Sequence, residues 1–195
     1  MNDDAPNPDV TAPDVTAENR LPGDPTRDEV VARMLRVDHA GEYGAVRIYA
    51  GQRAVLRHGT AARTIDGMAE KEREHLQTFD RLIGERRVRP TALMPLWHVA
   101  GFALGAATAM MGARTAMACT AAIEEVIDQH YADQAARLGD DEAELRATIE
   151  TYRADEIAHR EEALAHDAEQ APGYEILTGA IKTGSRLAIW LSTRI

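Results

Sequence analysis

Two copies of one pattern hold the residues that can do chemistry: a single glutamate, a long interval, and then Glu-x-x-His. The six residues are Glu42, Glu72 and His75 in the first copy, and Glu124, Glu156 and His159 in the second. The interval from the single to the paired glutamate is 30 residues in one copy and 32 in the other. Residues three apart share a face of an α-helix, so each pair can bind one metal ion. Four carboxylates and two imidazoles on four helices are the ligand set of a carboxylate-bridged di-iron centre, which we therefore predict.

Each acidic residue taken alone has a simpler interpretation as part of a solvated helix surface. Glu72 lies between Glu70 and Glu74, and helical periodicity leaves open whether Glu124 or Glu125 faces inward. The two matched copies nevertheless favour a metal site. Carboxylate oxygens and imidazole nitrogens, without a thiolate, suit Fe(II) or Mn(II) better than structural zinc.

Residues near the six candidates can support them. Tyr131 follows Glu124 by seven residues and returns to almost the same helix face, so we expect it to support the site without binding metal. Asp155 can accept the second N–H of a ligating histidine. We expect structural hydrogen bonds for His39 and His130, which fall on other faces.

Two glycines, Gly41 and Gly44, flank Glu42 inside an expected helix. Each costs about 1 kcal/mol relative to alanine there. Glycine at these positions indicates the close approach of another helix or of a substrate.

The elements that must position these residues are all helical. Residues 1–25 contain five prolines and few large apolar residues, and we expect a disordered acidic tail there. Thr26 and Glu29 resemble a capping box that opens a helical domain over residues 26–195. The expected helices span about 26–57, 60–87, 95–111, 114–138, 141–167 and 174–192.

Two of these helices lack the ligand pattern and have apolar surfaces. Residues 91–113 carry no formal charge, but Pro95 and three glycines favour a buried or membrane-interface helix over a membrane span. The last helix is amphipathic, with the apolar residues Ile176, Leu177, Ile181, Leu187, Ala188 and Leu191 expected on one side. Lys182 and Arg186 can then meet anionic headgroups. Packing within a bundle core or a dimer interface is the alternative.

Bulk properties exclude several classes of protein. The net charge of −10 argues against a nucleic-acid partner. The single cysteine, Cys119, suits a reducing compartment, and we expect it to be a small core residue. The N-terminus lacks the features of a signal or transit peptide, which favours a bacterial protein facing the cytoplasm. No glycine-rich dinucleotide fingerprint is present.

Several segments resemble the demethoxyubiquinone hydroxylase family. They are residues 36–45 (Arg-Val-Asp-His-Ala-Gly-Glu-Tyr-Gly-Ala), 89–91 (Arg-Pro-Thr), 95–97 (Pro-Leu-Trp), 101–106 (Gly-Phe-Ala-Leu-Gly-Ala), 116–120 (Ala-Met-Ala-Cys-Thr) and 166–169 (His-Asp-Ala-Glu). The resemblance runs from about Arg33 to the C-terminus. It implies a ferritin-like four-helix bundle with two additional membrane-interface helices. It also implies the six ligands above, and thus Glu124 rather than Glu125.

The resemblance further implies an activity and its partners. The chain would be a di-iron monooxygenase that uses O₂ to hydroxylate the ring of a polyprenyl methoxy-methyl-benzoquinol late in ubiquinone biosynthesis. NADH would supply electrons, directly or through the quinone. A polyprenyl substrate implies peripheral attachment to the cytoplasmic side of the inner membrane.

Two other functions fit parts of the pattern. A ferritin-like iron-oxidising or peroxide-handling protein would share the ligands but not need the uncharged segment. A non-catalytic quinone-binding module would need no metal. The sequence leaves open the prenyl length, the electron donor, homo-oligomerisation, partner proteins of the pathway, and iron versus manganese.

Overall fold

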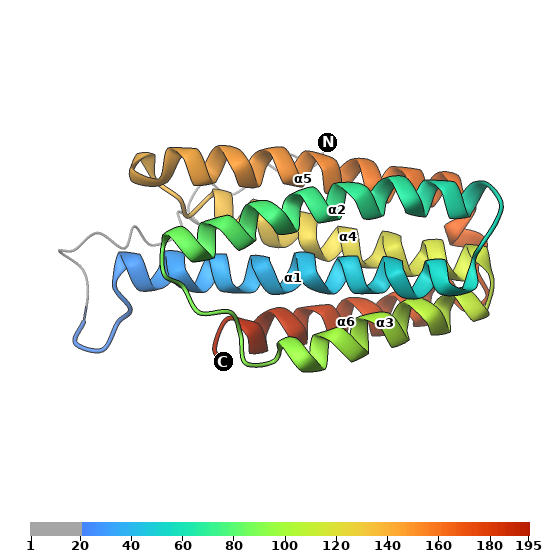
Figure 1. Cartoon of the computed structure of the whole chain (residues 1–195), viewed down its shortest axis with the longest axis horizontal. Helices are drawn as coiled ribbons and strands as arrows, with labels where there is room; N and C mark the ends of the chain where they lie inside the picture. The colour runs from blue at the N-terminus through green and yellow to red at the C-terminus, as the bar shows by residue number, and fades with distance from the viewer. Residues whose placement is uncertain (1–20) are drawn as a thin grey trace, which may run out of the picture.

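The computed structural model describes residues 21–195, which form six α-helices, two short 3₁₀ turns and no β-strand. Most of the predicted tail lies outside the described residues. The helices are α1 (Arg27–Val55), α2 (Thr60–Glu85), α3 (Met94–Met110), α4 (Ala113–Ala135), α5 (Ala143–Ala165) and α6 (Tyr174–Ser192). The chain reverses direction between successive helices (Figure 1). The prediction of an all-α fold is confirmed for this part of the chain.

The predicted capping box opens α1. The Thr26 hydroxyl accepts the Glu29 backbone N–H at 3.2 Å, and the Glu29 carboxylate accepts the Thr26 backbone N–H at 2.7 Å. These two bonds satisfy backbone donors that a helix start otherwise leaves unpaired. The sequence signature therefore gave the start of the longest helix correctly.

The chain between α4 and α5 departs from the prediction. Helix α4 ends at Ala135, three residues before the expected Leu138, and residues 140–142 form a 3₁₀ turn rather than the start of α5. The Arg27 side chain donates to the Arg137 carbonyl oxygen at 2.9 Å and to Asp141 at 3.0 Å. A contact from α1 thus stabilises the turn, which local helix propensity could not reveal.

The helices form three layers of two. Helices α2 and α5 make one outer layer, α1 and α4 the middle, and α3 and α6 the opposite flank (Figure 1). Helix α1 packs against α2 and α3, and α4 packs against α5 and α6. The core between the first two layers includes Leu35, Phe79, Met117 and Ile149, all fully buried. This arrangement is consistent with a ferritin-like bundle that has two added helices.

Helix α3 approaches α1 very closely through glycines. A Cβ atom at Gly105 would overlap the Ile48 carbonyl oxygen, and one at Gly51 would overlap the Phe102 carbonyl oxygen. Small residues at such a crossing let two backbones come together. The approach predicted at Gly41 and Gly44 is different: a Cβ at either position would meet nothing within 4 Å, and only the Gly44 carbonyl oxygen lies near α3.

Helix α6 also differs from its predicted amphipathic pattern. Ile181 packs into the core with Leu177, but Ile176 and Leu187 are 83% and 56% exposed. Lys182, expected to meet headgroups, instead donates to Glu125 of α4 at 2.6 Å. None of the helices in residues 21–195 combines the length and hydropathy needed to cross a bilayer.

Candidate metal centre

The six candidate ligands converge in the bundle core from four helices. Helix α1 contributes Glu42, α2 contributes Glu72 and His75, α4 contributes Glu124, and α5 contributes Glu156 and His159. All six residues are buried in the core. Helices α3 and α6 contribute none, so the site lies between the α2–α5 layer and the α1–α4 layer.

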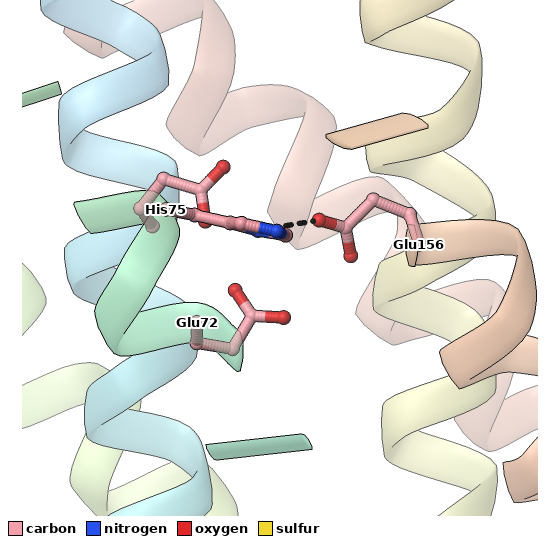
Figure 2. Close-up of side chains that lie close together, drawn as sticks. Glu72, His75 and Glu156 are labelled. Carbon is pink, nitrogen blue, oxygen red and sulfur yellow. Dashed lines mark ion pairs between the residues drawn. The ribbon is translucent and has the colours of Figure 1, made fainter. Parts of the chain in front are cut away.

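Each histidine directs Nδ1 at carboxylates from other helices. His75 Nδ1 lies 3.3 Å from Glu156 Oε1 and 3.5 Å from Glu42 Oε2. Figure 2 shows the His75 ring facing the Glu156 carboxylate across the gap between α2 and α5, with Glu72 one turn along α2. In the other half of the site, His159 Nδ1 lies 3.1 Å from Glu72 Oε1.

The potential ligand atoms form two overlapping groups, within each of which they lie no more than 4.8 Å apart. One group contains Glu42 and His75, and the other contains Glu124 and His159. Glu72 and Glu156 belong to both groups. The geometry therefore suits two neighbouring cations that share two carboxylates.

The donor atoms that face one another lack hydrogen bonds. Nδ1 of both histidines, both carboxylate oxygens of Glu72 and Glu156, and Oε2 of Glu42 and Glu124 are buried without a hydrogen-bond partner. Buried polar atoms are rarely left unpaired, because each costs free energy. Oxygen and imidazole nitrogen donors in this number fit divalent iron or manganese.

The ionisation behaviour of the cluster follows from burial and mutual repulsion. Burial raises the pKa of Glu72 and Glu124 well above the ordinary range for glutamate, and the Glu156 charge raises both further. Burial also raises the pKa of Glu156. For His75, burial lowers the pKa, but the carboxylates of Glu156 and Glu42 outweigh it and raise the pKa to about 11. Divalent cations would offset this concentration of negative charge.

Two buried tyrosines form hydrogen bonds between α1 and α4 at the site. Tyr49 of α1 donates its hydroxyl to Glu124 Oε1 of α4 at 2.5 Å, and Tyr131 of α4 donates to Glu42 Oε1 of α1. Each of these glutamates thus has one oxygen held by tyrosine and one left unpaired. Tyr131 was predicted near the site from its spacing to Glu124, whereas its hydrogen bond is to Glu42.

The sequence missed Tyr49, although a signal was available. Tyr49 follows Glu42 by seven residues, just as Tyr131 follows Glu124 by seven. Extending the two-copy comparison by seven residues would have found it.

Asp155 behaves as predicted. Its carboxylate accepts the Nε2–H of His75, with an N–O distance of 3.0 Å. Tyr152 stacks on the same imidazole, with ring centroids 3.8 Å apart. A carboxylate on the far nitrogen fixes the tautomer that presents Nδ1 to a metal.

The remaining predicted residues have structural contacts. His39 bonds Asp80 at 3.0 Å, and His130 bonds the buried Asp38 at 3.1 Å, as expected for residues outside the ligand set. Burial raises the pKa of the Cys119 thiol to about 12, so it stays protonated in the core.

The structure also separates Glu124 from its neighbour Glu125. The Glu124 side chain is buried in the cluster. Glu125 instead forms ion pairs with Lys182 at 2.6 Å and with Arg160 at 3.3 Å. Glu124 is therefore the inward-facing member of the pair.

Comparisons with known proteins identify the family of this chain. Residues 29–192, which include all six candidates, match the family model described as ubiquinone biosynthesis protein COQ7. The 3-demethoxyubiquinol 3-hydroxylase of Rhodospirillum rubrum is 58% identical over 181 residues, covering 92% of this chain and 85% of that protein. The mitochondrial NADPH-dependent 3-demethoxyubiquinone 3-hydroxylase of Homo sapiens is 50% identical over 169 residues, covering 85% and 78%. The mitochondrial 5-demethoxyubiquinone hydroxylase of Saccharomyces cerevisiae is 40% identical over 180 residues, covering 84% and 77%. The chain belongs to the ubiquinone biosynthesis protein COQ7 family, as its sequence motifs predicted.

Proposed function

We infer that this chain is a 3-demethoxyubiquinol 3-hydroxylase of ubiquinone biosynthesis. The observation that carries the inference is the buried cluster of four glutamates and two histidines whose inward atoms lack hydrogen bonds. The cluster lies within the region that matches the family and its hydroxylases. Burying these ionisable groups without partners costs free energy, and metal binding would offset that cost.

We propose that the cluster holds two iron ions. Glu42 and His75 would bind one ion, Glu124 and His159 the other, and Glu72 and Glu156 both. Bound ferrous iron supplies the electrons and Lewis acidity that activate O₂. One oxygen atom enters the ring of the quinol and the other leaves as water, so each turnover consumes two electrons and two protons.

The chain's own residues prepare this chemistry. Tyr49 and Tyr131 each hold one carboxylate oxygen, of Glu124 and Glu42 respectively, and would leave the other oxygen available to a bound ion. Asp155 orients the His75 ring. Buried apolar residues, including Ala45 and Ala121 one turn from Glu42 and Glu124, exclude bulk water from the cluster.

We propose that the α3–α6 flank lies at a membrane interface, on the cytoplasmic side of the inner membrane. Its exposed apolar residues are Leu96, Val99, Met110 and Met111 on or just after α3, and Ile176, Leu187 and Trp190 on α6. A polyprenyl quinol partitions into the bilayer, so a surface of this kind lets the enzyme collect its substrate. In this proposal α3 and α6 are the two helices added to a ferritin-like bundle.

We propose a reduced nicotinamide as the source of electrons. Mitochondrial relatives are named as NADPH-dependent, whereas the family resemblance implied NADH. Assays with each cofactor, and with a pre-reduced quinol alone, distinguish direct reduction of the metal from reduction through the quinone.

One experiment, begun in the absence of oxygen, tests this proposal. The purified protein is loaded with Fe(II), bound iron is counted, and a short-chain demethoxyubiquinol with reductant is added before ¹⁸O₂. We expect two irons per chain and one labelled oxygen in the product. Glu156→Ala should abolish product, whereas Glu161→Ala, an exposed residue of the same helix, should not. Iron without labelled product would instead support an iron-oxidising protein, and no bound iron would contradict the metal centre.

A further inference from the structure

The two halves of the candidate centre are closely matched in most respects. Each half has one glutamate whose outer oxygen is held by a tyrosine from the opposite helix. Both halves share Glu72 and Glu156. Each also has one buried histidine whose Nδ1 faces the cluster without a hydrogen bond. A difference between the two metal positions must therefore arise outside these shared features.

The difference lies on the far side of the two imidazoles. His75 Nε2 is bonded to the Asp155 carboxylate at 3.0 Å, and the ring is stacked on Tyr152. His159 has no hydrogen bond at Nε2 to any group in residues 21–195, and its side chain is 7% exposed compared with 1% for His75. The far nitrogen of His75 thus has a protein partner, whereas that of His159 has none within residues 21–195.

The sequence repeat explains this asymmetry. Asp155 immediately precedes Glu156, and the residue at the matching position before Glu72 is Lys71. An ammonium group cannot accept an imidazole N–H, so it cannot do for His159 what Asp155 does for His75. The Lys71 side chain is half exposed and lies 3.9 Å from Asp155 itself. The two copies thus have opposite charges, Lys71 and Asp155, at the position from which Asp155 bonds a candidate histidine.

We propose that the two metal positions fill in a fixed order, the Glu42–His75 position first. The inference rests on the proposed metal centre and adds a difference in affinity within it. Asp155 fixes the tautomer of His75, restricts its ring and makes Nδ1 a stronger donor, so less order is lost when metal binds. Loss of such a partner typically weakens metal binding about 10–100-fold. Asp155 is here a positioning residue that acts through His75.

The experiment measures metal binding by itself, without turnover. Co(II) is titrated into metal-free full-length protein in the absence of oxygen and followed by its visible absorption. His159→Ala should keep one binding event with the tighter wild-type affinity, and His75→Ala should keep one with the weaker affinity. In the His159→Ala background, Asp155→Ala should weaken the remaining event about 10-fold or more. In the His75→Ala background, Asp155→Ala should change the Co(II) affinity of the remaining event less than about 2-fold.

A matched control is available on α2. Asp80 accepts from His39 at 3.0 Å, the same distance as Asp155 from His75, but away from the cluster. Asp80→Ala also removes one carboxylate beside a histidine, and it should leave both affinities unchanged. If Asp155→Ala fails to keep its helical circular dichroism, Asp155→Asn takes its place, with a smaller loss of affinity because the amide oxygen still accepts a hydrogen bond.

The outcomes separate this inference from the proposed function. Wild-type protein that binds no Co(II) and no Fe(II) contradicts the metal centre altogether. Two bound ions combined with equal affinities of the two histidine variants would refute only the order of filling. Equal loss of metal affinity at both positions in Asp155→Ala would also refute only the order of filling.

Discussion

Four buried glutamates and two buried histidines lie together in the core of this protein. The pKa values of Glu72 and Glu124 are raised mainly by burial, so folding favours their protonated forms. The carboxylates near His75 outweigh its burial and favour its charged form. Metal binding requires the opposite protonation state at each of these residues. The metal-free and metal-bound proteins should therefore respond to pH in opposite ways.

We predict that the metal-free protein is less stable at pH 8 than at pH 6. An acid whose pKa is raised by folding destabilises the folded state progressively as pH rises above its unfolded pKa, near 4.5 for Glu72. The stabilisation from protonated His75 is complete below pH 6.5 and is lost as pH rises toward 11. Both effects have the same sign between pH 6 and 8. A loss of about 1 kcal/mol would lower Tm by roughly 2–4 °C.

Thermal unfolding in the presence of a chelator measures this effect. Added Co(II) should stabilise the protein more at pH 8 than at pH 6, because its ligands must lose protons. A metal-free protein whose Tm is unchanged or higher at pH 8 would contradict the assignment of these protonation states.

We predict that Tyr49→Phe destabilises the metal-free protein by about 1–3 kcal/mol, because Glu124 Oε1 loses its buried partner. Urea unfolding measures the change. Tyr174→Phe is the matched control, since the Tyr174 hydroxyl has no hydrogen bond to any group in residues 21–195 and the ring is half-buried. Equal stability of the two variants would show that the Tyr49 bond contributes nothing.

The sequence identified the residues that gather at the site better than it identified their partners. Spacing along one helix tells which residues share a face, and that placed Tyr131 and Asp155 correctly near the cluster. It does not tell which residues of another helix lie opposite, so the bond from Tyr131 to Glu42 was not foreseen. Helical spacing also left the choice between Glu124 and Glu125 open. The family resemblance implied Glu124, and the ion pairs of Glu125 with Lys182 and Arg160 agree with that choice.

At the scale of secondary structure, α1 and α3 come together at glycines that leave no space for a side chain. Gly105 lies against the Ile48 carbonyl, and Gly51 against the Phe102 carbonyl. Because Glu42 lies on α1, the position of α3 is coupled to the helix that contributes a candidate ligand. A change at the crossing should therefore affect stability although it is remote from the cluster.

We predict that Gly105→Ala destabilises the protein by about 1–3 kcal/mol, because the new methyl group forces α3 away from α1. Gly184→Ala on α6 is the control: its Cβ would meet nothing within 4 Å, and alanine is the better helix former. That variant should be equal or up to about 1 kcal/mol more stable. Urea unfolding compares the two, and a Gly105→Ala protein as stable as wild type would disprove the tight crossing.

Helix number and approximate extent were predictable, because periodicity, Pro and Gly punctuation and the Thr26 capping box are local signals. The details that failed depend on distant residues. Arg27 stabilises the turn after α4, and Glu125 pairs with Lys182 of α6. Neither contact follows from the residues of the element that it changes.

At the scale of the whole molecule, the three layers separate chemistry from surface properties. The α2–α5 and α1–α4 layers hold the cluster, and the α3–α6 flank has most of the exposed apolar residues (Figure 1). The sequence predicted that both helices had apolar surfaces but assigned Ile176 and Leu187 to the same face as Ile181. In the structure Ile181 packs against α4, whereas Ile176 and Leu187 are exposed.

We predict that Val99→Glu with Leu187→Glu weakens binding to vesicles of phosphatidylethanolamine and phosphatidylglycerol by at least about 10-fold. Each substitution removes an exposed apolar side chain from the flank and adds a negative charge. Ile157→Glu on α5, in the opposite outer layer, is the control and should bind as wild type does. Vesicle flotation measures binding, and an unchanged double variant would place the membrane contact elsewhere.

The crossed tyrosines have a consequence for how such a bundle can originate. Tyr49 serves the glutamate of the second copy, and Tyr131 serves the glutamate of the first. Reciprocal contacts of this kind, i to j and j to i, are those of a two-fold symmetric dimer. A helical hairpin carrying one copy could therefore complete the centre only by pairing with an identical hairpin. In a single chain, unlike in a dimer of identical hairpins, the two copies can differ, as Lys71 and Asp155 do.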